Sequence, residues 1–212
     1  MSPITLAIPK GRVTRALAPL FERAGIDPAP ILADDRTLVR TSADGRLRFL
    51  LLKPDDVPTY VEYGAAELGV SGRDTLRERG YDLYQPLDLE VGACRLVVAG
   101  PSDRPIPAVP RVATKYPRAA TEHFAARGVQ AEVIYVQGSV EIAPLVGLAD
   151  LIVDLVESGA TLRDNGLVEK ETIAQVSSVL VANPSLYKLR YAEIEPIVTK
   201  LRVAVEEARK LK

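Results

Sequence analysis

The 212-residue sequence has one cysteine, one histidine, one methionine and no tryptophan. A single cysteine, Cys94, excludes an intramolecular disulfide and a cysteine-rich zinc site, and is typical of a reducing compartment. Cys94 lies in the apolar stretch ACRLVVA, and we expect it to be a buried strand residue. The lone histidine, His123, leaves no transition-metal cluster to propose, and its polar-leaning helix favours a surface role.

Long hydrophobic runs and an excess of one charge are also missing. No segment reaches the roughly 18 to 20 apolar residues that span a bilayer, and the start MSPITLAIPKGR lacks the features of an export signal. The 27 Lys and Arg against 28 Asp and Glu give a net charge of -1. The total charge therefore provides no positive electrostatic field that would attract a polyanion. We therefore expect a cytoplasmic protein that binds neither membrane nor nucleic acid.

Short apolar runs alternate with amphipathic stretches, which predicts an α/β fold with largely parallel strand pairing. The first helix is predicted after PKGR, with an apolar face at helical spacing and Gly25 as its stop. The proline-rich stretch 100–110 is either a domain linker or, as we prefer, a loop inside a second lobe. Further elements are predicted as helices over 118–128 and 140–149, a long strand region over 171–184, and two closing helices divided near Pro196.

The pattern G-x-A-[DE]-L-x-V occurs twice, from Gly64 and from Gly147. Chance could produce such a permissive match. If the echo is real, two lobes of like topology each present a loop at the carboxyl end of an equivalent strand, where α/β folds bind ligands. A cleft between two lobes is then the expected place for a site.

The second of these strands continues into DLVESGATL, residues 154–162. Small residues let the chain turn around an oxyanion with its amides pointing inward, and Ser158 and Thr161 add hydroxyl donors. The carboxylates of Asp154 and Glu157 would repel a bare phosphate. They can instead accept hydrogen bonds from two adjacent hydroxyls of a sugar that also carries a phosphate and a bound magnesium ion. The combination suggests a phosphorylated ribose; the alternative is a helix cap with a solvated acidic rim. No Walker pattern and no G-x-G-x-x-G occurs, which removes the main support for P-loop and dinucleotide folds.

Several long motifs extend over nearly the whole chain: LAIPKGRV, PDDVPTYVEYGAAELGVSGRDTL, RVATKYP, GSVEIAPLVGLADLIVDLVESGATLRDNGL and SSVLVANPSLYK. In this order they resemble the catalytic subunit of ATP phosphoribosyltransferase in its short form. The resemblance implies the first reaction of histidine biosynthesis, in which ATP and 5-phosphoribosyl 1-pyrophosphate (PRPP) give phosphoribosyl-ATP and pyrophosphate with Mg²⁺. It also implies a two-lobed fold like the type II periplasmic binding proteins, with the active site in the inter-lobe cleft. Residues 1–91 with 178–212 would form the ATP-side lobe, and 92–177 the PRPP lobe.

The resemblance also implies partners and site residues. A regulatory subunit similar to histidyl-tRNA synthetase would join homodimers of this chain in a larger hetero-oligomer. Lys10, Glu141 and Asp154 are the expected catalytic residues, and Mg²⁺ would be carried by the substrate pyrophosphate without a metal site of the protein. The PRPP-binding set is expected to be Asp154, Glu157, Ser158, Gly159, Ala160, Thr161 and Leu162. The ATP-binding set is expected to be Lys10, Gly11, Arg12, Ser71, Gly72, Asp74, Arg111, Thr114 and Lys115, although strand alternation lets only some of the last three face a site.

The chemistry itself needs no basic histidine. Adenine N1 carries a lone pair and no proton, so alignment and charge stabilisation carry the reaction. Three alternatives remain at this stage: a phosphoribosyltransferase for another base, a solute-binding protein of the same architecture, and a non-catalytic scaffold.

Overall fold

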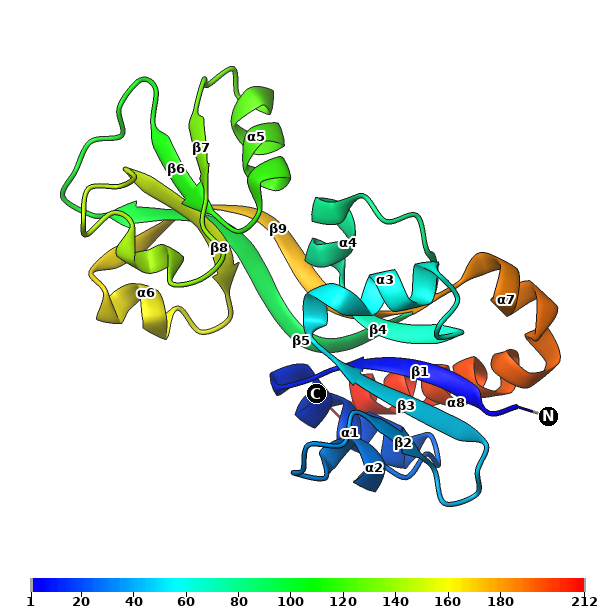
Figure 1. Cartoon of the computed structure of the whole chain (residues 1–212). Helices are drawn as coiled ribbons and strands as arrows, with labels where there is room; N and C mark the ends of the chain where they lie inside the picture. Colours follow the sequence, from blue (N-terminus) through cyan, green and yellow to red (C-terminus); the bar gives the residue numbers. More distant parts are fainter. Residues whose placement is uncertain (1, 212) are drawn as a thin grey trace. The chain divides into compact units, whose positions relative to one another are not determined.

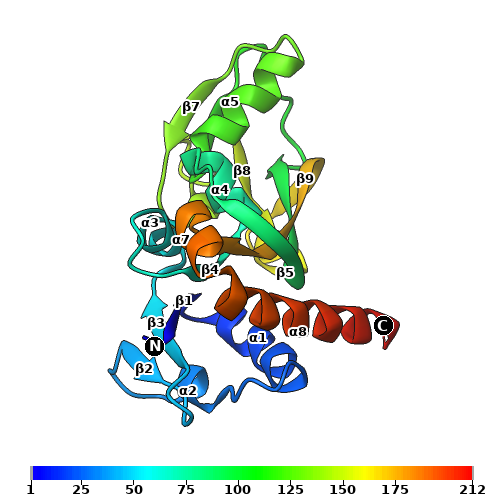
Figure 2. The same cartoon turned by 90° about the vertical axis from the view of Figure 1, so that its right-hand side faces the viewer.

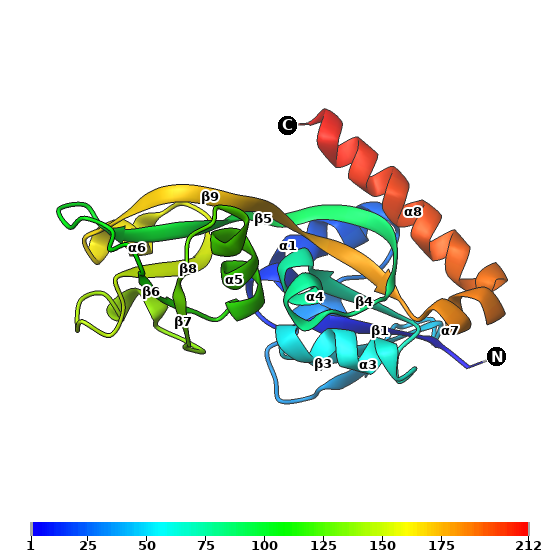
Figure 3. The ribbon, with the colours of Figure 1, turned by 90° about the horizontal axis from the view of Figure 1, so that it is seen from above.

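The computed structural model describes residues 2–211, and the chain divides into two compact units. The first unit runs to Gly92 and resumes at Ser177, and the second comprises Ala93–Val176. Two long strands, β5 (Tyr84–Pro101) and β9 (Leu167–Ala182), each continue from one unit into the other (Figure 1 and Figure 3). The long strand predicted over 171–184 is present but shifted: it begins earlier, at Leu167, and ends at Ala182, because Pro184 begins α7.

The sheet of the first unit follows the alternation read from the sequence. Its strands lie in the order β2-β3-β1-β4-β9-β5, with β2 at Val39–Thr41, β3 at Leu47–Leu52, β1 at Ile4–Pro9 and β4 at Leu68–Gly72. Strands β3 and β4 both pair parallel with β1, whereas β2 and β9 pair antiparallel with their neighbours β3 and β4. Helices connect the parallel strands, as such crossovers require.

Helices cover both faces of this sheet. On one face α1 (Arg12–Arg23), α2 (Ala29–Leu32) and α8 (Tyr191–Lys210) pack on a core that includes Phe21, Phe49 and Leu201 (Figure 2). On the other face η1 (Pro54–Asp56), α3 (Val57–Glu62) and α4 (Arg73–Arg79) lie over a smaller cluster around Val61 and Leu76. Since both faces are covered, the central strands β1 and β4 are mostly apolar, and all six residues of β1 are buried, Thr5 included.

The two closing helices are present, but their division near Pro196 is wrong. Helix α7 (Pro184–Leu189) and α8 meet at Arg190, and Pro196 lies inside α8. A proline there removes one backbone hydrogen bond. The helix continues because its other face buries Ile194, Val198 and Leu201 in the core.

The second unit is a smaller sheet in the order β9-β5-β8-β6-β7, with β8 at Leu151–Val156, β6 at Arg111–Thr114 and β7 at Glu132–Tyr135. Strand β6 pairs parallel with both β7 and β8, and β5 pairs antiparallel with β8. Side chains alternate between two cores: Leu96 and Val98 face the side of α5 (Pro117–Ala126), while Val97 and Ala99 face the side of α6 (Ala160–Asp164). Cys94 is buried in the first of these cores, as predicted for a strand residue.

The repeated G-x-A-[DE]-L-x-V pattern has the same structure in both units. Gly64 and Gly147 both adopt left-handed backbone, with φ of 72° and 73°. The acidic residue of each copy then accepts a hydrogen bond from the neighbouring parallel strand: Glu67 from the Thr5 amide and Asp150 from the Arg111 amide, both at 2.8 Å. In each unit the repeated pattern therefore forms the same turn, strand and hydrogen bond to the neighbouring parallel strand.

Two expectations in the second unit are wrong. The helix predicted over 140–149 is only a single 3-10 turn, η2 (Val140–Ile142), followed by turns. Pro144 has no amide to donate, and Gly147 at positive φ leaves the helical region, so the apolar spacing cannot be realised as a helix. The second is the surface role of His123, which is buried: only 8% of the surface of this residue is exposed.

The buried His123 ring has polar partners. Its Nε2 lies 3.1 Å from Glu171, and its Nδ1 lies 3.2 Å from an Arg127 nitrogen. Burial, and then the Arg127 charge, lower the pKa of the imidazole. The histidine therefore has a packing role beside Phe124 that the polar-leaning helix did not reveal. In the described part of the chain, no helix is long and apolar enough to cross a membrane.

Candidate active site

Three predicted or newly identified segments meet at one edge of the first unit. Strand β1 ends at Pro9 beside Leu52 of β3, and Ala7 lies beside Gly69 of β4. Because these strands are parallel, the segments after them share one sheet edge: Lys10–Arg12, Lys53, and Ser71–Asp74 with the intervening Gly72 and Arg73. We call these segments the first-unit edge. Carboxyl edges of parallel strands are where α/β folds bind ligands.

The turn at Lys10–Arg12 is held by backbone contacts, which leaves its side chains exposed. The Lys10 amide donates to the Leu52 carbonyl at 2.7 Å, and the Thr14 hydroxyl donates to the Pro9 carbonyl. Gly11 has φ of 102° and ψ of -138°, a conformation that side chains rarely adopt. Lys10 and Arg12 are exposed and bring two positive charges to this edge.

The turn after β4 is tight for a steric reason. A Cβ at Gly72 would lie 2.1 Å from Asp74 Oδ1, so only glycine lets that carboxylate fold back over the start of α4. Ser71 is almost completely buried, and its hydroxyl donates to the Gly72 carbonyl at 3.4 Å. Gly72 and Asp74 thus present the surface of this turn, whereas Ser71 supports it.

Two further positive residues lie at this edge, neither of which was given a role from the sequence. Lys53 follows β3 directly and is exposed. It lies at this edge because β3 pairs with β1, a pairing that the sequence alone does not reveal. Arg73 lies in the VSGRD turn and its guanidinium is 3.1 Å from Asp88. Asp88 also accepts hydrogen bonds from the Ser177 hydroxyl at 3.0 Å, which links the turn to both long strands, β5 and β9. No local motif marks Lys53, whereas Arg73 lies within the motif VSGRD.

The second unit has an equivalent edge. Thr114 of β6 lies beside Val153 of β8, so the next residues in register are Lys115 and Asp154. Glu141 follows β7 by way of Ser139, whose φ of 48° is unusual for a residue with a side chain. Lys115, Glu141 and the segment Asp154–Leu162 form what we call the second-unit edge.

Asp154 is the most perturbed carboxyl group of this edge. Burial raises its pKa, and the Leu155 amide, which donates to its Oδ1 at 2.8 Å, acts in the opposite direction. The negative charge of Glu141 raises the pKa further, and the positive charge of Lys115 lowers it. These three residues therefore interact electrostatically, and a perturbed group at the carboxyl end of a strand is a functional-site candidate.

The segment after β8 is a turn of small residues that leads into α6, with Gly159 as the N-cap of this helix. The helix cap given as the alternative is therefore present, and phosphate binding by the same turn stays a prediction. Gly159 has φ of 75°, and a Cβ there would lie 3.1 Å from Arg163 Nη1. The Arg163 guanidinium donates to the Ser158 carbonyl at 3.0 Å, and the Ser158 hydroxyl accepts from the Ala160 amide at 3.3 Å. Leu162 is buried and anchors the turn in the core.

The exposed members of this turn have room for a ligand. Glu157, Ser158, Ala160 and Thr161 are exposed. The Glu157 carbonyl accepts a hydrogen bond from Arg95 Nη1 at 3.1 Å, which orients the turn from behind. Backbone amides and hydroxyls of such a turn can bind phosphate oxygens.

Two residues of the expected ATP set are engaged elsewhere. Thr114 is fully buried; its hydroxyl donates to the Val153 carbonyl at 2.6 Å and accepts from the Tyr116 amide at 2.8 Å. Arg111 starts β6 and lies 3.6 Å from Asp150, near the amino end of β8. Four residues of strand, about 13 Å, separate Asp150 from Asp154, so Arg111 lies away from Lys115 and the second-unit edge.

Together the fold and these edges define a two-unit α/β protein with the architecture of the periplasmic binding proteins. The structure of the periplasmic aliphatic sulphonate binding protein SsuA from Escherichia coli matches with a TM-score of 0.64 at 14% identity, covering 100% of this chain and 75% of that one. At this identity the likeness shows the fold alone. A shared fold does not define function, so the chemistry has to be argued from the residues of the two edges.

Sequence comparisons identify the family. The family model HisG: ATP phosphoribosyltransferase matches residues 53–203. An ATP phosphoribosyltransferase of Sorangium cellulosum is 62% identical over 206 residues, covering 97% of this chain and 98% of the relative. A chain from the ATP phosphoribosyl transferase (HisG:HisZ) complex of Thermotoga maritima has a TM-score of 0.82 at 34% identity, covering 96% of this chain and 99% of that chain. The chain belongs to the ATP phosphoribosyltransferase family.

Proposed function

We propose that this chain transfers the 5-phosphoribosyl group of PRPP to N1 of the adenine of ATP, releasing pyrophosphate, as the first step of histidine biosynthesis. The observation that carries the proposal is the second-unit edge, where a partly buried carboxylate, Asp154, precedes an exposed turn of small and hydroxyl residues. Membership of the family, at 62% identity to a named relative, supports the same reaction.

The second-unit edge would bind PRPP. The backbone amides from Glu157 to Leu162 and the hydroxyls of Ser158 and Thr161 suit the 5-phosphate, and the Asp154 carboxylate suits the two ribose hydroxyls. Glu141 adds a second negative charge that interacts with Asp154. Two carboxylates beside a ribosyl carbon that becomes cationic stabilise the transition state more than the ground state.

The first-unit edge would bind ATP. Lys10, Gly11 and Arg12 suit the polyphosphate, since cations and exposed amides bind anionic oxygens. Gly72 and Asp74 offer a close backbone approach and a carboxylate acceptor, with Ser71 buried beneath them. To this set we add Lys53, the exposed cation that sheet order brings to the same edge.

Lys115 is retained in the proposal because it interacts with Asp154, whereas Thr114 and Arg111 are left out of it. The Thr114 hydroxyl already donates and accepts a hydrogen bond in the core, and Arg111 pairs with Asp150.

The chain's residues supply alignment and charge and need not supply a base. Adenine N1 has a lone pair without a proton, so attack on the anomeric carbon requires no deprotonation. Lys10 and Lys115 would favour the negative charge that develops on the departing pyrophosphate. Asp154 and Glu141 would favour the positive charge left on the ribosyl centre.

The residues present are compatible with Mg²⁺. The second-unit edge offers carboxylate and hydroxyl oxygens, the donors that this ion prefers, and the described residues contain no cluster of three or more His, Cys, Asp or Glu. An ion bound chiefly by substrate phosphates and one or two carboxylates needs no larger cluster. Mg²⁺ would neutralise charge on the pyrophosphate, and Asp154 and Glu141 are carboxylates of this edge that would be available to it as ligands.

A regulatory partner and a cytoplasmic location complete the proposal. The Thermotoga maritima relative comes from a HisG:HisZ complex. We propose that this chain likewise forms a homodimer within a larger hetero-oligomer, with a regulatory subunit that resembles histidyl-tRNA synthetase. A single buried cysteine suits a reducing compartment.

The decisive experiment follows phosphoribosyl-ATP formation by ultraviolet absorbance, with ATP, PRPP, Mg²⁺ and pyrophosphatase to pull the reaction forward. Turnover by the purified chain, or by the chain with its partner, supports the proposal, and GTP in place of ATP should give none. Product with another base but not with ATP would identify a different phosphoribosyltransferase. PRPP binding without any turnover would indicate a scaffold, and absence of PRPP binding a solute-binding protein.

A further inference from the structure

Two arginines of the second unit hold successive carbonyl groups of the turn that follows β8. Arg95 of β5 donates from Nη1 to the Glu157 carbonyl at 3.1 Å, and Arg163 of α6 donates from Nη1 to the Ser158 carbonyl at 3.0 Å. Hydrogen bonds from a charged donor are about twice as strong as those between neutral groups. Two adjacent peptide groups of the turn are therefore each fixed at their oxygen end.

Arg95 is itself held in one orientation. Its Nε donates to both carboxylate oxygens of Glu169 at 3.0 Å, and its Nη2 donates to Glu169 Oε2 at 2.8 Å. The Thr172 hydroxyl donates to Glu169 Oε1 at 2.9 Å and so holds the carboxylate in turn. Because the guanidinium is a rigid planar fork, two of its nitrogens on Glu169 direct the third, Nη1, at the Glu157 carbonyl.

The two arginines differ in the charge that they bring to the turn. The charge of Arg95 is matched by Glu169, whose side chain is 28% exposed against 33% for Arg95. Within residues 2–211 Arg163 forms no ion pair with a carboxylate. It lies close against the turn, since a Cβ at Gly159 would be 3.1 Å from its Nη1. Arg163 therefore keeps its positive charge beside this turn.

The direction of each carbonyl determines the direction of the next amide. In a planar trans peptide the C=O of one residue and the N–H of the next point in opposite directions. With the carbonyls of Glu157 and Ser158 directed at the arginines, the amides of Ser158 and Gly159 point away from them. Within residues 2–211 neither amide donates a hydrogen bond, and Ser158 is exposed. A cation at the carbonyl oxygen also polarises the peptide group and makes the following amide a stronger donor.

We propose that Arg95 and Arg163 are positioning residues for PRPP: by holding two carbonyls of the turn they direct the amides of Ser158 and Gly159 at the 5-phosphate. The inference rests on the proposed function, in which this turn binds that phosphate. Arg95 acts through the backbone conformation alone, whereas Arg163 acts through both the conformation and its charge. Both effects fall on PRPP and leave ATP binding unchanged.

The test measures the dissociation constant of the full-length chain for PRPP by calorimetry, and the KM values for PRPP and ATP from phosphoribosyl-ATP formation. Arg95→Met combined with Glu169→Gln removes the matched pair without changing the net charge. This double variant should raise the dissociation constant and the KM for PRPP about tenfold, with the KM for ATP unchanged. Glu169→Gln alone loosens Arg95 without removing it and should give a smaller rise, about threefold.

Arg163→Gln separates charge from conformation. It should also raise the dissociation constant for PRPP about tenfold, and it should reduce the dependence of this constant on ionic strength, because a positive charge is lost beside a phosphate. The double variant at Arg95 and Glu169 should keep the ionic-strength dependence of the unmodified chain.

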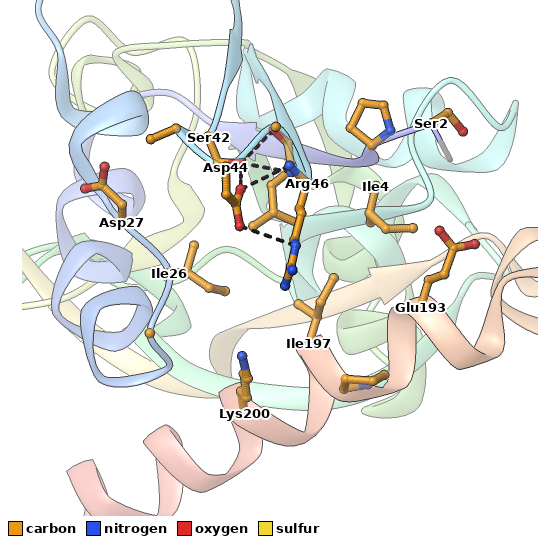
Figure 4. A pocket seen from close by; sticks show the side chains of 16 residues that line it. Ser2, Ile4, Ile26, Asp27, Ser42, Asp44, Arg46, Glu193, Ile197 and Lys200 are labelled. Carbon is orange, nitrogen blue, oxygen red and sulfur yellow. Dashed lines mark hydrogen bonds and ion pairs between the residues drawn. The ribbon is translucent and has the colours of Figure 1, made fainter.

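Matched controls come from the first unit. Arg46 pairs with Asp44 of its own hairpin at 3.8 Å, beside the cavity between the β2–β3 hairpin and α8 (Figure 4). Arg46→Met combined with Asp44→Asn removes a neutral pair, and Arg46→Gln removes a single exposed arginine charge. Neither control should change a constant for PRPP or ATP. Circular dichroism and melting temperature check that every variant is folded.

Turnover by the unmodified chain, together with an unchanged KM for PRPP in both the double variant and Glu169→Gln, would overturn the inference and leave the proposed function intact. A rise in the KM for ATP equal to that for PRPP would do the same, because it would show a general disturbance of the fold. An ionic-strength dependence unchanged by Arg163→Gln would overturn the role of its charge. If the unmodified chain binds no PRPP, the proposed function itself is refuted, and this inference with it.

Discussion

Replacing Asp154 by asparagine should inactivate the enzyme and at the same time stabilise the fold. Asparagine has the same shape and keeps an oxygen that can accept from the Leu155 amide, now 2.8 Å from Oδ1. The substitution therefore removes a charge but neither a hydrogen bond nor volume. Loss of one preorganised electrostatic contact at a reacting centre typically costs about 10²- to 10³-fold in kcat.

The sign of the stability change follows from the raised pKa. Burial, reinforced by Glu141, makes Asp154 harder to ionise in the folded chain than in the unfolded chain. The folded state then binds more protons between the ordinary aspartate pKa of 3.8 and the raised pKa, so stability falls as the pH rises through this window. At neutral pH the ionised carboxylate destabilises the fold, and Asp154→Asn relieves this.

The assay compares melting temperature and phosphoribosyl-ATP formation for the unmodified chain, Asp154→Asn and a control, Asp164→Asn, which alters an exposed carboxylate on α6. Surface changes usually stay within about 0.5 kcal/mol, or about 2 °C for a chain of this size. A gain above that for Asp154→Asn at pH 7, shrinking toward pH 4, is expected. A lowered melting temperature, or more than a tenth of the activity retained, would refute the reasoning.

Three further substitutions test the structure. Gly159→Ala forces a side chain into left-handed backbone 3.1 Å from Arg163 Nη1 and should raise the KM for PRPP about tenfold, and an unchanged KM in steady-state kinetics would contradict it. Lys53→Ala should raise the KM for ATP about tenfold but not that for PRPP, with Lys188→Ala as the unaffected control. Arg190→Ala removes a pair with Glu67 in which both side chains are under 15% exposed, and should lower stability by about 3 kcal/mol in urea unfolding; a loss below about 1 kcal/mol would show that the pair is solvated.

The alternation of apolar runs predicted the α/β class because it reports directly which segments are buried. The errors occurred where tertiary packing decided between local possibilities. Pro196 suggested a helix break, but the apolar face of α8 holds the helix through it, and the break falls at Arg190, where the guanidinium pairs with Glu67 and Glu193. The spacing of 140–149 suggested a helix, but Pro144 and Gly147 prevent it.

The candidate site was predictable where its residues are contiguous. Residues 154–162 form the expected turn because Gly159 and its small neighbours dictate local backbone. Lys53 was missed because its place depends on β3 lying next to β1, a pairing between distant segments. Thr114 was included because strand alternation cannot say, before the sheet is known, that its hydroxyl points to Val153.

The internal repeat explains why the chemistry is divided between the two edges. Within G-x-A-[DE]-L-x-V the two copies do the same work: glycine turns the chain, and Glu67 or Asp150 holds the neighbouring parallel strand at its amino end. Beyond the shared valine the copies differ, SGRD in the first and DLVESGAT in the second. The first continuation adds to an edge with the cations Lys10 and Lys53, suited to a polyphosphate. The second provides carboxylate and hydroxyl oxygens, suited to a ribosyl group that becomes positive. The two copies thus share one local scaffold, and their different continuations at the carboxyl ends of the repeated strands fit the two substrates that we propose.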